Sequence, residues 1–102
     1  MITIANKKNG YIDGEYVGRP SPLGNPFHLD RESNRDECIE KYREWLYKKI
    51  ENKDEKILEE LGRLHSKWIT KGSLRLLCWC SPKRCHADVI KEILDSRAQQ
   101  MD

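Results

Sequence analysis

Two segments of this 102-residue chain concentrate side chains that could bind anions, ligate metals or attack an electrophile. The first is GRPSPLGNPF, over Gly18–Phe27, and the second is CWCSPKRCHADVI, over Cys78–Ile90. Together they hold all four prolines and three of the four cysteines. Because Gly and Pro fix backbone shapes that ordinary core packing does not need, this concentration predicts a shaped site.

The first segment combines a permanent positive charge with a stiff backbone. The Arg19 guanidinium is a planar fork that suits phosphate or carboxylate. Prolines lower the entropy lost by a fixed loop, and glycine gaps let backbone N–H groups approach an anion. We therefore predict that Arg19 and the amides of residues 21–25 hold a phosphate. The predicted ligand-binding residues are Arg19, Ser21, Gly24, Asn25 and Phe27. The alternative is an ordered loop that caps the sheet, with Phe27 in the core.

The second segment supports an anion site or a nucleophile. It begins with a strand, and Cys85 and His86 are expected in the first turn of the helix that follows. Unpaired N–H groups and the helix dipole attract anions to such a turn. The predicted contacts are Ser81, Lys83, Arg84, Cys85 and His86. Alternatively, the helix start activates Cys85 as a nucleophile, with His86 or His28 as the base.

Zinc and simple burial are the two other interpretations of this segment. The candidate zinc ligands are Cys78, Cys80, Cys85 and His86. Their spacing is unusual, because C-x-C is tighter than C-x2-C and adjacent helical residues point about 100° apart. Without a metal, the strand thiols are small apolar side chains.

Local patterns predict an alternation of strands and helices. Strands are expected over 1–5, 11–17 and 73–80, and helices over 33–50, 54–70 and 82–97, with frayed residues after 97. We expect the apolar stripes of the helices, with Trp45, Trp68 and Ile69, to face the core. Cys38 is expected on a helix face, and His65 at a solvated or boundary position.

This order predicts one small three-layer α/β domain with a short, mainly parallel sheet. Ligands of such sheets bind at the carboxyl ends of the strands. Both special segments follow a strand, so we expect both at that edge.

Composition restricts the class of partner. A net charge of +2 argues against a coat for extended nucleic acid, but not against a single nucleotide. No apolar run approaches the roughly 18 residues of a membrane span, and the start lacks a signal-peptide core, so we predict a cytoplasmic protein. So small a domain offers a surface cleft, or a site completed by a homo-oligomer.

The chain resembles a family of small bacterial and phage proteins, domain of unknown function 4326. The similarity rests on residues 16–27, 42–46 and 76–90, which read YVGRPSPLGNPF, YREWL and LLCWCSPKRCHADVI. The Cys85-His86 pair is also similar to the end of a second uncharacterised family with a Rossmann-like fold. The resemblance implies a compact Rossmann-like fold and, by analogy, a nucleotide ligand. It also implies a role in handling host nucleotides or nucleotide signals in phages.

The leading functional hypothesis is a nucleotide-binding protein without catalysis or a cofactor, which sequesters a nucleotide-derived signal of the cyclic or ADP-ribose type. The second is an enzyme that acts on a nucleotide or nucleoside through Cys85 and His86. The third is a small zinc-bound interaction module.

Overall fold

The described part of the chain folds as three α-helices, one short 3-10 helix and a three-stranded sheet. A computed structural model describes residues 1–9, 14–27, 35–79 and 85–100. Its elements, in chain order, are β1 (Ile2–Asn6), the 3-10 helix η1 (Lys7–Asn9), β2 (Glu15–Tyr16), α1 (Arg35–Glu51), α2 (Glu55–Lys71), β3 (Leu74–Cys78) and α3 (His86–Gln100). The expected α/β class is therefore confirmed.

Helix α2 shows how local sequence sets the ends of an element. At its start, the Asp54 carboxylate caps the helix by accepting the N–H of Ile57 at 3.1 Å. At its end, Gly72 adopts a left-handed φ of 77° and donates its N–H to Trp68 O. A residue with a Cβ rarely adopts this conformation, so glycine stops the helix here.

The sheet is short and wholly parallel, in the order β1-β3-β2. Ile2 pairs with Leu74 in the β1–β3 register, and Tyr16 pairs with Leu77 in the β2–β3 register. Strand β3 is thus central, as its apolar run predicts. The predicted sheet type is confirmed.

One core cluster joins the helices to one face of the sheet. From the strands it takes Ile2, Leu74, Leu76 and Cys78, which share a face through strand alternation. The helices contribute Ile39, Tyr42, Leu46, Ile57, Leu61, Leu64, Ala87, Val89, Ile90, Ile93 and Leu94. Trp45 and Trp68 are partly buried and pack against this cluster, as expected.

Two core predictions are wrong. Ile69 is 59% exposed, because it lies beyond the edge of the apolar stripe of α2. His65 is buried at 7% exposure and packs edge-on against Trp68, although its Nε2 makes no hydrogen bond. A helical stripe about 100° wide leaves its flanking positions undecided, so the sequence could not place these two residues.

Several predicted boundaries shift. Strand β2 is only Glu15–Tyr16, and residues 11–13 of the predicted strand lie outside the described part. Helix α3 starts at His86 rather than 82 and continues to Gln100, beyond the expected end at 97. No helix in the described part of the chain has the length and apolar character needed to cross a membrane.

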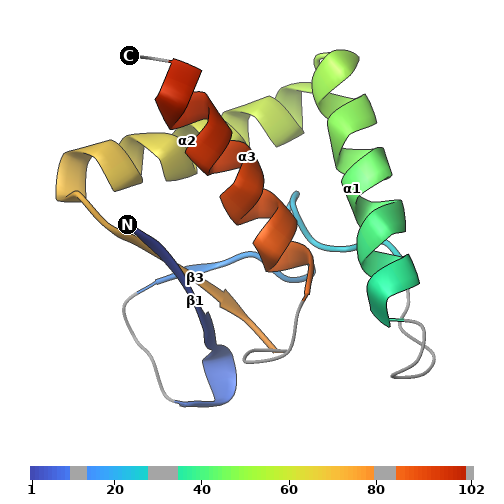
Figure 1. The fold of residues 1–102 in the computed structure, drawn as a ribbon, viewed down its shortest axis with the longest axis horizontal. Helices are drawn as coiled ribbons and strands as arrows, with labels where there is room; N and C mark the ends of the chain where they lie inside the picture. Colours follow the sequence, from blue (N-terminus) through green and yellow to red (C-terminus); the bar gives the residue numbers. More distant parts are fainter. Residues whose placement is uncertain (10–13, 28–34, 80–84, 101–102) are drawn as a thin grey trace.

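The two special segments meet at one end of the molecule. Figure 1 shows the carboxyl ends of β1 and β3 and the N-terminal ends of α1 and α3 at the same end of the fold, and residues of the segment after β2 line a cleft with them. This is the edge at which parallel sheets present ligand sites.

Candidate functional site

A cleft of about 240 Å³ opens at this end of the molecule. Its aromatic lining consists of Tyr16, Phe27 and Trp79, and its cationic lining of Arg19 and Arg35. The remaining lining residues are Gly18, Asn25, Cys38, Ile39, Cys85 and His86. Segments far apart in the sequence therefore build one site.

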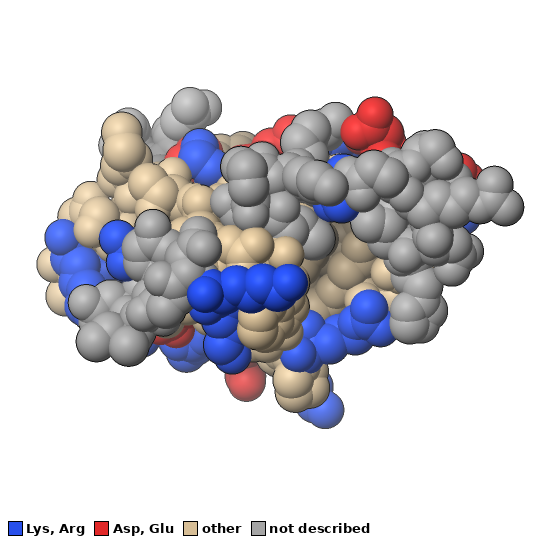
Figure 2. All heavy atoms as spheres, turned by 90° about the horizontal axis from the view of Figure 1, so that it is seen from below, with Lys and Arg blue, Asp and Glu red and all other residues tan. Residues whose placement is uncertain are grey.

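The face that carries the cleft is basic. Figure 2 looks onto this end and shows Lys and Arg side chains gathered around a hollow, with acidic side chains toward its edges. Arg19 is exposed and Arg35 is half-buried. The arrangement attracts anions although the whole chain is nearly neutral.

The loop over residues 18–27 is fixed to the core by Tyr42. The buried Tyr42 hydroxyl donates to Leu23 O at 2.6 Å. Burial raises the pKa of this phenol far above its ordinary value of 10.0, and the nearby Cys85 adds to the shift. The phenol therefore remains a donor at any ordinary pH.

Most amides of this loop are already used within it. Ser21 N donates to Gly18 O, Gly24 N donates to Ser21 O, and Leu23 N donates to the Ser21 hydroxyl. These groups satisfy one another and shape the loop. We expected amides in this stretch to hold a phosphate, but these three point at partners in the loop.

Close backbone approach explains the glycine at position 24. A Cβ there would lie 2.9 Å from both the Cα and the N of Arg19. Real Cβ atoms do not come so near to backbone, so a larger residue would displace Arg19. Gly24 thus acts by shaping the loop beneath a cleft cation.

Asn25 also has a structural task. Its Oδ1 accepts the N–H of Phe27 at 2.9 Å, and its Nδ2 donates to Cys38 Sγ at 3.5 Å. Cys38 in turn donates to Phe27 O at 3.7 Å. The three residues tie the end of the loop to α1 and hold the Phe27 ring at the cleft, where it also packs against the core.

A second polar chain positions the opposite wall. The Trp79 indole N–H donates to the Tyr16 hydroxyl at 3.0 Å, and this hydroxyl donates to Arg19 O at 2.8 Å. The Lys7 ammonium lies 4.3 Å from the centre of the Tyr16 ring. Trp79 is still 50% exposed, so its ring remains accessible beside the cleft.

The hydrogen bond of His86 fixes its tautomer. Its Nε2 lies 2.7 Å from Val17 O, and a carbonyl only accepts, so Nε2 carries the proton. Burial lowers the pKa of His86, and Arg19 lowers it further, against the Val17 contact and Asp88, which raise it. The ring packs edge-on against Tyr42 and is neutral near pH 7, which leaves Nδ1 as an acceptor.

The start of α3 is largely satisfied by its own residues. Cys85 N donates to the Asp88 carboxylate at 2.9 Å, and Asp88 N donates to Cys85 O at 3.1 Å. Ala87 N donates to Cys85 Sγ at 3.4 Å. The Asp88 charge also occupies the positive end of the helix dipole. The N–H groups of Cys85, Ala87 and Asp88 thus have partners within the helix start, and the anion site predicted here stays a prediction.

The family model described as Domain of unknown function (DUF4326) matches residues 2–96. The chain belongs to this family. The suspected resemblance is thereby confirmed over nearly the whole chain. No curated protein and no solved structure matches it. Rossmann-like thus remains a prediction, as the fold shown is α/β with a parallel sheet.

Parts of the predicted site of this DUF4326 protein lie outside the described residues. These parts are His28, Cys80, Ser81, Lys83 and Arg84. Within the described ranges, no three His, Cys, Asp or Glu side chains gather closely enough to hold a metal ion. The zinc interpretation, which needs Cys80, stays a prediction.

Sequence reasoning missed the contributions of Tyr16, Arg35, Cys38, Ile39 and Trp79 to the cleft. Arg35 begins α1, and nothing in its neighbourhood marks it as part of the site. Trp79 could have been predicted as accessible, because strand alternation places its side chain on the face opposite the buried Cys78.

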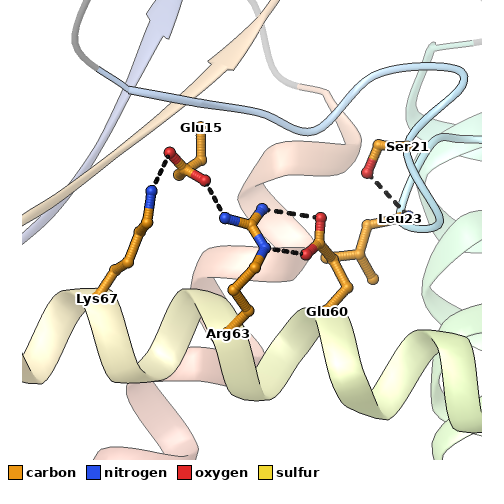
Figure 3. Close-up of polar contacts among 6 residues, drawn as sticks. All are labelled: Glu15, Ser21, Leu23, Glu60, Arg63 and Lys67. Atoms are coloured by element: carbon orange, nitrogen blue, oxygen red, sulfur yellow. Dashed lines mark hydrogen bonds and ion pairs between the residues drawn. The ribbon is translucent and has the colours of Figure 1, made fainter.

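An ion network of this DUF4326 protein holds β2 on α2. Lys67 donates to Glu15 at 2.9 Å, and Arg63 pairs with both Glu15 and Glu60 (Figure 3). Burial raises the pKa of Glu15, but the hydrogen bonds and charges of Lys67 and Arg63 outweigh it and lower the pKa overall. Strand β2 leads directly into Val17 and Arg19, so the network supports the cleft from behind.

Proposed function

We propose that the cleft binds a small nucleotide or nucleotide-derived molecule. The observation that carries this proposal is the convergence of two arginines and three aromatic rings on one cleft at the carboxyl end of a parallel sheet. A nucleotide joins the two complementary features, an anionic phosphate and a planar ring.

Aromatic walls suit the planar part of such a ligand. Stacking on an aromatic side chain contributes about 1–3 kcal/mol per base and tolerates any base. Trp79 is the best placed platform, because it is half exposed while its indole N–H is fixed by Tyr16. A ring held between this wall and Phe27 would leave its edges to polar groups of the cleft.

The arginines suit the anionic part. Guanidinium–phosphate contacts are charge-assisted and often bidentate. Arg19 and Arg35 come from different elements, so they can approach one phosphate from two sides. We assign the phosphate to these side chains because both line the cleft and carry a permanent charge.

Size limits the ligand. Clefts for drug-sized molecules span about 300–1,000 Å³, and this one is slightly smaller. It therefore accommodates one nucleotide unit. A dinucleotide, a cyclic signal or an ADP-ribose derivative would leave part of the ligand outside, toward the basic face. Sequestration of such a signal by a phage protein is the corresponding biological role that we propose.

Catalysis on the bound ligand is the second candidate function. It is favoured by His86, a neutral imidazole with Nδ1 as an acceptor, and by the adjacent Cys85, since both line the cleft. A general base has this protonation state. Binding alone remains our first proposal, because these residues also have structural partners.

A thermal-shift screen tests the proposal. The purified protein is heated with nucleoside monophosphates, cyclic nucleotides, ADP-ribose, plain nucleosides and inorganic phosphate, and each ligand is then analysed by mass spectrometry. We expect stabilisation by nucleotides that exceeds that by nucleosides or phosphate. Ligands recovered intact support binding alone, and converted ligands support the enzyme.

Matched variants decide whether the cleft is responsible. Arg19→Ala should abolish most of the stabilisation by nucleotides. Arg43→Ala is the control, since Arg43 pairs with Glu40 and Glu92 outside the cleft. Equal stabilisation of the parent and Arg19→Ala by every nucleotide would refute the assignment.

A further inference from the structure

Cys78 and Cys85 bring two thiols together behind the cleft. The Cys85 thiol donates to Cys78 Sγ across 3.3 Å. Cys78 ends β3 and Cys85 precedes α3, so residues 79–84 join them. Both are unbridged thiols. They face each other where the end of β3, directly before Trp79, meets the start of α3 at His86.

The start of α3 offers the Cys85 sulfur a hydrogen-bond donor and the positive end of the helix dipole. This sulfur accepts the Ala87 N–H at 3.4 Å, and each of these two features favours the thiolate. Burial and the Asp88 carboxylate act in the opposite direction. We therefore expect a thiol that reacts slowly with a small oxidant.

Access differs between the two sulfurs. Cys85 lines the cleft and is 4% exposed, whereas Cys78 is fully buried. A molecule as small as hydrogen peroxide, entering through the cleft, meets Cys85 first. Cys78 lies behind Cys85, in the interior of the protein.

We propose that Cys78 and Cys85 form a peroxide-reactive dithiol site that closes to an intramolecular disulfide. The Cys85 thiolate attacks one oxygen of hydrogen peroxide, so that an S–O bond forms, the O–O bond breaks and hydroxide leaves. The Cys78 thiolate attacks Cys85 Sγ, an S–S bond forms and a second hydroxide leaves. The two thiol protons neutralise both hydroxides, so two thiols and one peroxide give a disulfide and two waters.

Cys38 shows why position in the cleft is not sufficient. It is also buried and also lines the cleft. Its sulfur interacts with Asn25 and Phe27 O, and no other thiol of the described residues bonds to it. Oxidation of Cys38 has no resolving partner there, so Cys38→Ser is a matched control.

Peptide mapping after treatment with one equivalent of hydrogen peroxide tests the site. The folded, reduced protein is oxidised, its remaining thiols are alkylated, and it is digested with trypsin and chymotrypsin. Trypsin separates Cys85 from Cys78 at Arg84, and chymotrypsin separates Cys78 from Cys80 at Trp79. We expect loss of two of the four thiols, a mass lower by two hydrogens, and a Cys78–Cys85 link in the parent, Cys38→Ser and Cys80→Ser proteins.

The partner variants assign the roles. Cys85→Ser retains a side chain that caps a helix, so it should fold and form no disulfide. Cys78→Ser, and Cys78→Ala if serine is not tolerated in the core, should accumulate a sulfenic acid at Cys85 that dimedone traps. No disulfide in the parent, a link that uses Cys80, or sulfenic acid at Cys38 alone would each overturn the proposal. The result does not depend on the nucleotide, so the two proposals fail separately.

Discussion

The Tyr42 hydroxyl donates a hydrogen bond of 2.6 Å to the carbonyl of Leu23, and thereby joins α1 to the loop that carries Arg19. Both partners are fully buried. The bond links the core of the fold to one wall of the cleft, so a change in the core should be measurable as a change in ligand binding.

Tyr42→Phe should lower the free energy of unfolding by about 1–3 kcal/mol, because it leaves the buried Leu23 carbonyl without its donor. It should also weaken nucleotide binding, since the loop loses an anchor. Urea unfolding measures the first effect and calorimetric titration the second. Tyr47→Phe is the control, since Tyr47 is 46% exposed. Equal effects of the two variants would contradict the anchoring role.

Gly24→Ala should destabilise the protein by about 1–3 kcal/mol, because the added Cβ meets the Arg19 backbone at 2.9 Å. The same substitution at Gly62 adds a Cβ to α2 in open space. Gly62→Ala should therefore stabilise the protein by about 0.5–1 kcal/mol. Thermal unfolding of both variants tests the pair. If Gly24→Ala is as stable as the parent, the loop does not have the shape described.

Glu15→Gln should cost about 1 kcal/mol at neutral pH, since it weakens the contacts of Lys67 and Arg63 with β2. The folded pKa of Glu15 is lowered from 4.5, so its contribution is present above pH 4.5 and is lost as the pH falls through the folded value. Unfolding free energies measured across this range should converge for parent and variant at low pH. The exposed pair Glu37–Lys41 provides the control, and Glu37→Gln should change little.

His86 should make stability depend on pH in a defined direction. Its folded pKa is lowered from 6.5, so the unfolded chain binds the proton more readily. The neutral form therefore favours folding above pH 6.5, and this advantage is lost as the pH falls through the folded value. In the His86→Gln variant, the free energy of unfolding should fall less steeply than in the parent as the pH drops below 6.5. Imidazole resonances followed by NMR should show His86 titrating below pH 6.5, and a value above it would contradict the burial that lowers its pKa.

The parts of the fold that the sequence predicted are those set by local rules. Asp54 and Gly72 set the two ends of α2 through contacts within one turn. The apolar run of β3 predicts that this strand is buried, as it is in the structure. The direction of Ile69 depends on how α2 is rotated against its neighbours. The sequence alone does not fix that rotation.

The site was predicted in the same uneven way. Glycines, prolines and Arg19 marked the loop, and Cys85 and His86 marked the helix start. Arg35 reaches the cleft because α1 begins beside this loop. That neighbourhood is set by tertiary packing, which local sequence patterns do not describe. The use of several loop amides within the loop likewise depends on turns that composition does not specify. The sequence therefore marked residues that the structure brings together in one cleft, and the assignment of a phosphate to groups of this loop stays a prediction.

The most direct test of the proposed binding is an NMR titration of the Trp79 indole N–H with a nucleoside monophosphate and with the matching nucleoside. We predict a saturating shift with the nucleotide and binding of the nucleoside weaker by about tenfold or more, as a charge-assisted contact requires. Arg19→Ala and Arg35→Ala should lose this difference, and Arg43→Ala should keep it. No shift with any nucleotide, or equal affinity for nucleotide and nucleoside in the parent, would contradict the proposal that this cleft binds a nucleotide through its arginines and aromatic rings.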